Sequence, residues 1–64
     1  MPSVQVNIWP GRDAEFKKKL IEGITNVFVE NGIPRHAVEV IIYEVPKENW
    51  GIGGEPASEK FPEL

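Results

Sequence analysis

Cysteine is absent from this sequence of 64 residues, which excludes disulfide bonds, a thiolate nucleophile and thiolate metal ligands. Long apolar runs are also absent, because no stretch approaches the about 18 consecutive apolar residues that would span a bilayer. No secretory signal pattern opens the chain, since Gln5 and Asn7 interrupt the first apolar segment. These absences predict a single domain over residues 1–64 that resides in the cytoplasm and has no membrane partner.

Basic residues are few, with 7 Lys and Arg against 10 Asp and Glu and a net charge of -3. Binding to nucleic acid draws its affinity from many Lys and Arg contacts to phosphate. The one basic cluster, at residues 17–19, lies in a helical pattern that also carries Glu15 and Glu22, and it is typical of solvated helix surface. We therefore expect no nucleic-acid partner.

Apolar periodicity predicts a strand, a helix and a second strand. Residues 3–9 alternate strictly between polar and apolar side chains, as a half-buried strand does. An apolar stripe at helical spacing predicts a helix with Asp13 as its N-cap and its end at Asn31 and Gly32. Residues 37–45 are β-branched and apolar, which predicts a strand buried on much of both faces.

This order of elements predicts an α/β fold with a βαβ protomer. The two strands are expected to be parallel, because such crossovers are almost always right-handed. We expect a turn or short C-terminal hairpin at residues 50–54 and a loosely held tail at residues 56–64. A domain of this size buries only roughly 60% of the surface that its unfolded chain exposes. Two strands alone also make no stable sheet, so oligomerisation is expected.

Few residues offer conventional catalytic chemistry. His36 is the single histidine and stands in a predicted loop without partner ligands, so we assign no metal site. The glycine-rich run at residues 50–54 does not predict a phosphate-binding loop, because no strand leads into it and no helix follows it. Met1-Pro2 is the unusual feature, because removal of Met1 leaves a secondary amine that can act as a base. Desolvation and a nearby guanidinium would both favour the neutral amine.

Several short motifs occur together in the chain: Pro2, Gln5, Gly11-Arg12, residues 40–42 and residues 50–55. In this combination the chain resembles the 4-oxalocrotonate tautomerase family over nearly its whole length. The resemblance implies the tautomerase (MIF-like) fold, in which βαβ protomers pair into dimers with a four-stranded sheet. It further implies a homohexamer of three such dimers, with active sites near subunit boundaries.

The resemblance also implies a cofactor-free tautomerase that acts on an enol or 2-hydroxy-dienoate (2-oxo) acid. In that reading Pro2 is the general base, and Arg12 binds a carboxylate of the small-molecule substrate. Trp50 stands where phenylalanine is usual in the family and lines an apolar pocket. Fixed cations of this kind stabilise the dienolate that forms when a proton is removed.

One position departs from the family pattern, since Glu39 aligns with a second substrate-binding arginine. At about 4 Å and an effective dielectric of about 20, like charges cost on the order of 4 kcal/mol before screening. A dianionic substrate is therefore disfavoured. Arg35, four residues upstream, is a candidate replacement for the missing cation, and the alternative is that it is a surface arginine.

Other interpretations stay open at this point. Glu39 could position water for hydratase-like or dehalogenase-like addition on the same scaffold, or the protein could be a non-enzymatic oligomeric scaffold whose proline is incidental. Trp9, at the end of the first strand, is expected to be an interface anchor. The alternative to carboxylate binding by Arg12 is a surface ion pair with Asp13 or Glu15, which would contribute little.

Overall fold

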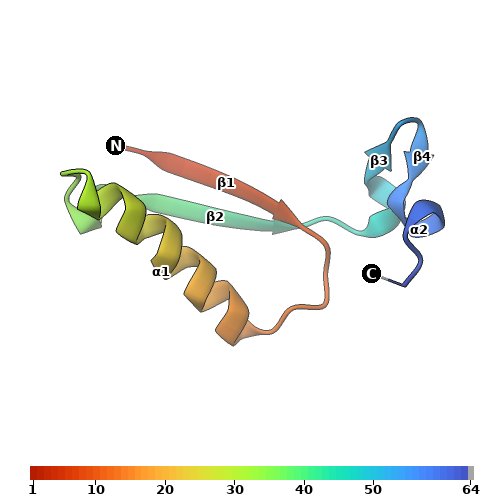
Figure 1. Cartoon of the computed structure of the whole chain (residues 1–64), viewed down its shortest axis with the longest axis horizontal. Coiled ribbons are helices and arrows are strands. Elements are labelled where there is room, and N and C mark those ends of the chain that lie inside the picture. Colours follow the sequence, from red (N-terminus) through yellow and green to blue (C-terminus); the bar gives the residue numbers. More distant parts are fainter. Residues whose placement is uncertain (64) are drawn as a thin grey trace.

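The computed structural model describes residues 1–63, which form a βαβ unit followed by a small C-terminal unit (Figure 1). The elements are β1 (Ser3–Ile8), α1 (Ala14–Glu30), the 3₁₀ helix η1 (Arg35–Ala37), β2 (Glu39–Glu44), the 3₁₀ helix η2 (Lys47–Asn49), β3 (Gly51–Ile52), β4 (Glu55–Pro56) and α2 (Ala57–Lys60). None of the helices in this described part has the length and apolar character needed to cross a membrane.

β1 and β2 pair in parallel, which confirms the predicted βαβ unit. Their register runs from Ser3 opposite Glu39 to Ile8 opposite Glu44. α1 crosses over one face of this pair (Figure 1). Glu44 at the end of β2 forms an ion pair with Lys17 of α1 at 3.0 Å. β2 is shorter than the predicted strand because the residues before Val38 turn into η1.

The ends of α1 lie where the sequence places them. The Asp13 carboxylate accepts a hydrogen bond of 2.9 Å from the backbone N–H of Phe16, which satisfies one of the free amides of the first turn. At the other end, Gly32 has a φ of 94°, and its N–H and that of Ile33 donate to carbonyls of the last turn at 3.1 Å. A left-handed glycine with these paired bonds is the Schellman motif that ends a helix.

Within residues 1–63, one face of the sheet has no covering element. α1 packs on the face of Val4, Val6 and Ile8, while the alternate side chains of both strands are exposed. We call this exposed side the open face, made of Ser3, Gln5, Asn7, Glu39, Ile41 and Tyr43. Ile41 is 43% exposed and Tyr43 is 47% exposed. The expectation of a second strand buried on both faces is therefore wrong for the single chain, because one helix covers only one face.

The C-terminal unit is more ordered than the sequence indicates. β3 and β4 form the expected hairpin, and its turn at Gly53 and Gly54 has φ values of 61° and 88°, as two-residue hairpin turns require. The tail expected to be loosely held contains α2, and Ala57 has 0% exposure. The Lys47 Nζ atom also donates to the Phe61 carbonyl at 2.8 Å. Leu64 lies outside the described residues.

The chain is extended for its length. Its radius of gyration is 14.6 Å, whereas a compact domain of this length has about 11 Å. In the part that the structure describes, Ala57 is the one apolar residue that is fully shielded from solvent. A single copy thus has a thin core between α1 and the sheet and leaves apolar surface open to association.

The N-cap of α1 gives a direct test of this local structure. We expect Asp13→Ala to lower the free energy of unfolding by about 1 kcal/mol, because it removes the acceptor of the Phe16 amide. Asp13→Asn should stay within a few tenths of a kcal/mol of the parent, because asparagine caps equally well. Urea unfolding followed by circular dichroism measures both, and an unchanged Asp13→Ala midpoint would contradict the assignment.

Candidate active site

A hollow of about 520 Å³ opens where β1 ends. Its walls come from the end of β1, the loop to α1, the first turn of α1 and the residue before β3, and they are Asn7, Ile8, Trp9, Pro10, Arg12, Phe16 and Trp50. Most of these side chains are apolar, and Arg12 is the one ionisable residue among them. We call this feature the Arg12 hollow.

The guanidinium of Arg12 lies against an aromatic ring rather than a carboxylate. Its central carbon is 5.1 Å from the centroid of the Phe16 ring. Over residues 1–63 the structure has one ion pair, between Lys17 and Glu44, so the surface ion pair considered for Arg12 does not form. Asp13, the nearest acidic residue in the sequence, instead caps α1. The N–H donors of Arg12 are consequently not occupied by a carboxylate of residues 1–63.

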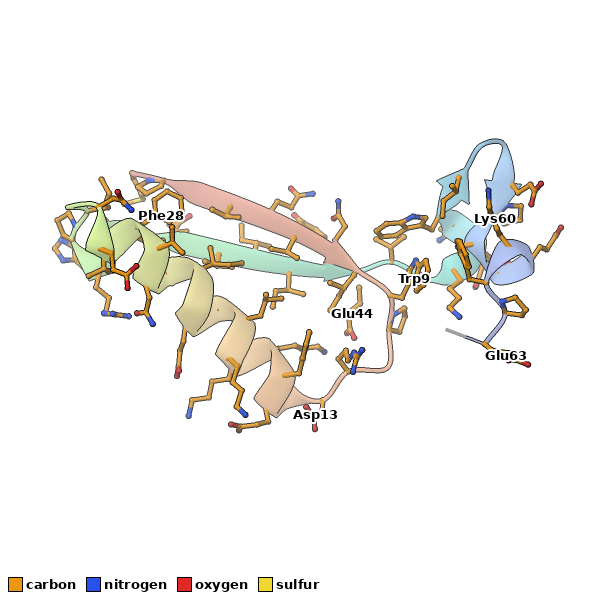
Figure 2. All side chains as sticks on the ribbon, in the orientation of Figure 1. Trp9, Asp13, Phe28, Glu44, Lys60 and Glu63 are labelled. Atoms are coloured by element: carbon orange, nitrogen blue, oxygen red, sulfur yellow. The ribbon has the colours of Figure 1, made fainter. Side chains whose placement is uncertain are left out.

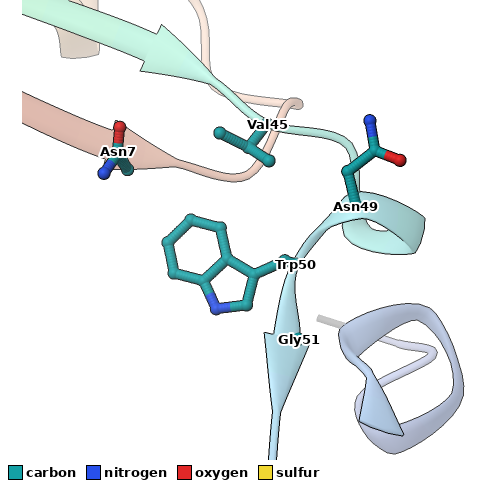
Figure 3. A pocket seen from close by; sticks show the side chains of 5 residues that line it. All are labelled: Asn7, Val45, Asn49, Trp50 and Gly51. Carbon is teal, nitrogen blue, oxygen red and sulfur yellow. The ribbon is translucent and has the colours of Figure 1, made fainter. Parts of the chain in front are cut away.

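Trp50 lies between the Arg12 hollow and a second, smaller one. The second hollow has about 310 Å³ and is lined by Asn7, Val45, Asn49, Trp50 and Gly51 (Figure 3). The ring of Trp50 reaches from the C-terminal unit toward the ends of β1 and β2 (Figure 3). It meets the ring of Trp9 edge to face, with centroids 5.8 Å apart and planes at 75°. Trp50 therefore borders both hollows, and neither of them contains Pro2.

Two aromatic residues of the Arg12 hollow, Trp9 and Phe16, were not predicted from the sequence to line a site. Trp9, expected to anchor an interface, contacts Trp50 and Phe61 within the chain and has the Lys47 Nζ atom 5.2 Å from its ring (Figure 2). Phe16 belongs to the apolar stripe of α1, yet its ring is 39% exposed and lies beside Arg12. The sequence holds one signal for the contact between Arg12 and Phe16. The two residues are four positions apart, on either side of the start of α1.

Pro2 lies at the other end of β1. Its carbonyl accepts a hydrogen bond of 2.9 Å from the backbone N–H of Glu39, which makes these two residues neighbours. The six residues of β1 separate Pro2 from the Arg12 hollow by about 20 Å at the usual strand rise. Figure 1 shows the N-terminus and the C-terminal unit at opposite ends of the molecule. One chain therefore does not bring Pro2 together with Arg12 and Trp50.

Arg35 is engaged elsewhere. Its Nη2 atom donates to the Asn26 side-chain oxygen at 2.6 Å and so ties η1 to α1. This contact favours a structural role for Arg35 over substrate binding. His36 is exposed in the same 3₁₀ helix, and within residues 1–63 no three His, Cys, Asp or Glu side chains are grouped as metal ligands would be.

Comparison with known proteins gives consistent matches. A family model described as "Tautomerase enzyme" matches residues 2–60. A 2-hydroxymuconate tautomerase from Comamonas testosteroni is 48% identical over 60 residues, which cover 92% of this chain and 95% of that protein. The solved structure of a 4-oxalocrotonate tautomerase isozyme from Methylibium petroleiphilum has a TM-score of 0.86 at 43% identity, covering 94% of this chain and 98% of its own.

A more distant solved structure is informative about assembly. It is a heterohexamer 4-oxalocrotonate tautomerase from Chloroflexus aurantiacus, with a TM-score of 0.83 at 28% identity. The match covers 92% of this chain and 97% of that one. The βαβ unit with its C-terminal hairpin is thus the fold that these solved structures share.

Proposed function

The chain belongs to the tautomerase family and is a tautomerase, an isomerase; we propose that its substrates are enol or 2-hydroxy-dienoate (2-oxo) acids. We further propose that the amine of Pro2 is the general base and that no cofactor takes part. The observation that carries the proposed substrate class is the Arg12 hollow, in which a guanidinium without a carboxylate partner among residues 1–63 stands among apolar walls. A small unsaturated acid has the matching chemistry, an anionic end on an apolar chain.

The charge distribution of the hollow suits the proposed reaction. Removing a proton from an enol acid produces a dienolate whose negative charge must be stabilised. A guanidinium offers several N–H donors in one plane and binds carboxylates in a bidentate manner. The rings of Trp9 and Trp50 form apolar walls of the same hollow, while Arg12 itself is exposed in the single chain.

The proposed base requires processing of the chain. With Met1 attached, the Pro2 nitrogen is an amide and has no basicity. Met1 is 85% exposed and is therefore accessible for removal. The secondary amine released at Pro2 would then take a proton from one substrate atom and return it to another. A positioned base of this kind typically contributes roughly 10² to 10⁴ in rate.

The proposed site needs more than one copy of the chain. Because β1 separates Pro2 from Arg12, the Arg12 and Trp50 of a second subunit must approach the Pro2 end of the first. The open face and the extended shape of the single chain support such an association. We propose a homohexamer of three dimers, in which pairing completes the sheet, in keeping with the hexameric Chloroflexus relative. We place this assembly in the cytoplasm.

The role of Pro2 is testable with two forms of one sequence. Protein shown by intact mass to begin at Pro2 should ketonise a 2-hydroxydienoate rapidly. The same protein retaining Met1 should be slower by roughly 10² to 10⁴, because its Pro2 nitrogen is an amide. Ultraviolet absorbance measures both rates. Equal rates in the two forms would contradict the proposal, and negligible rates in both would favour a non-enzymatic scaffold.

A second candidate function rests on the contact between Glu39 and Pro2. The backbone bond makes Glu39, an exposed acidic residue, a neighbour of Pro2, and in this candidate function its carboxylate acts beside the released amine. A carboxylate at that place favours the protonated amine and can position water, as a hydratase or dehalogenase reaction needs. The same carboxylate would repel a substrate that carries two negative charges.

Replacing Glu39 by glutamine distinguishes these effects. We expect Glu39→Gln to raise kcat/KM at least about tenfold for a dicarboxylate enol and little for a monocarboxylate, because a like charge is removed. Glu22→Gln, on the outer surface of α1, is the matched control and should change neither value. NMR of the products tests the alternative. If wild type forms hydration products and Glu39→Gln abolishes them, the role of Glu39 is to position water for hydration.

A further inference from the structure

Phe16 is the one residue of α1 that lines the Arg12 hollow. Leu20 and Ile24 of the same apolar stripe are half-buried, whereas Ile21 and Val27 are exposed at 40% and 57%. Phe16 is 39% exposed and lines the Arg12 hollow, with its ring centroid 5.1 Å from the guanidinium carbon of Arg12. Phe16 therefore lies only partly in the core, and its ring contacts the proposed carboxylate-binding cation.

The contact between this ring and Arg12 is compatible with anion binding. A guanidinium within about 6 Å of an aromatic centroid is attracted by the negative face of the ring. A guanidinium that stacks flat on a ring uses its face for this attraction, and its N–H groups then point outward in its plane. Arg12 can thus be held by Phe16 and still offer its donors to a carboxylate.

The ring itself is held in place by the start of the helix. Phe16 donates its backbone N–H to the Asp13 carboxylate at 2.9 Å, which fixes the first turn of α1. The Asp13 carboxylate forms no ion pair with Arg12 within the described residues, so it does not compete with Phe16 for the guanidinium. Residues 12–16 therefore act together. The Asp13 cap orders the first turn of α1, and the Phe16 ring restricts the Arg12 guanidinium.

We propose that Phe16 is a positioning residue, whose ring holds the Arg12 guanidinium in the hollow in the orientation that receives the substrate carboxylate. The proposal rests on the proposed function, in which Arg12 binds that carboxylate. Without the ring, the flexible Arg12 side chain would sample solvent and would lose rotamer freedom when the substrate binds. The consequence is a higher KM for acids, with kcat little changed.

The experiment compares Phe16→Leu, Phe16→Tyr and Arg12→Ala on a 2-hydroxydienoate monocarboxylic acid and on its methyl ester. Phe16→Leu keeps an apolar side chain but has no ring face, so KM for the acid should rise about two- to fivefold. Phe16→Tyr keeps the face and should behave as wild type. KM for the ester should not change in either variant, because the ester has no carboxylate for Arg12 to bind.

A double variant separates positioning from a general effect on the fold. Adding Phe16→Leu to Arg12→Ala should raise KM for the acid no further, because the ring then has no cation to hold. An equal rise for acid and ester, or a further rise in the double variant, would overturn the proposal. If Arg12→Ala alone leaves KM for the acid unchanged, the proposed role of Arg12 fails. If Arg12→Ala raises KM and Phe16→Leu does not, only the role of Phe16 fails.

Discussion

The parallel pairing of β1 with β2 is the constraint on which the rest of the account depends. It fixes Pro2 beside Glu39 at one end of the sheet and carries the chain to Arg12 and Trp50 at the other. Because a paired strand has a fixed rise per residue and does not shorten, no loop rearrangement in one copy brings these ends together. A chain with this topology can combine Pro2 with Arg12 only by association, and its open face and extended shape leave the surface for it.

The small C-terminal unit depends on aromatic contacts with the end of β1. Trp9 meets Trp50 edge to face and has Phe61 on another side, while Lys47 lies over its ring and binds the Phe61 carbonyl. Aromatic pairs of this geometry add about 0.5 to 1.5 kcal/mol beyond the burial of their area. These contacts hold Trp50 at the Arg12 hollow, so the same residues stabilise the fold and shape the proposed site.

The sequence predicts those features of the fold whose signals are local. The alternation before Trp9, the cap at Asp13 and the paired glycines at 53 and 54 each specify a conformation through neighbouring residues, and the structure confirms the elements. The exposure of Ile41 was not predictable, because an apolar strand gives no indication of how many elements cover it. The burial of Ala57 depends in the same way on contacts between distant segments.

The residues of the candidate site likewise fall into those that the sequence predicts and those that it does not. Arg12 and Trp50 were assigned through the resemblance to a family, and the structure places both at one hollow. The sequence does not predict Trp9 and Phe16 as site residues. Trp9 ends a strand and Phe16 belongs to the apolar stripe of a helix, and neither pattern indicates that the side chain faces the hollow. Pro2 was assigned correctly to the start of β1, but the distance from Pro2 to Arg12 follows only from the strand geometry.

Subunit complementation tests most directly the claim that the active site is shared between copies of the chain. One inactive parent has its Pro2 amine blocked by retained Met1, and the other carries Arg12→Ala; both are mixed in equal amounts, unfolded together and refolded. If each site takes Pro2 and Arg12 from different subunits, about one quarter of the sites regain both groups and activity returns in proportion. Mixed assemblies that native mass spectrometry confirms, yet that remain as inactive as the parents, would contradict the account.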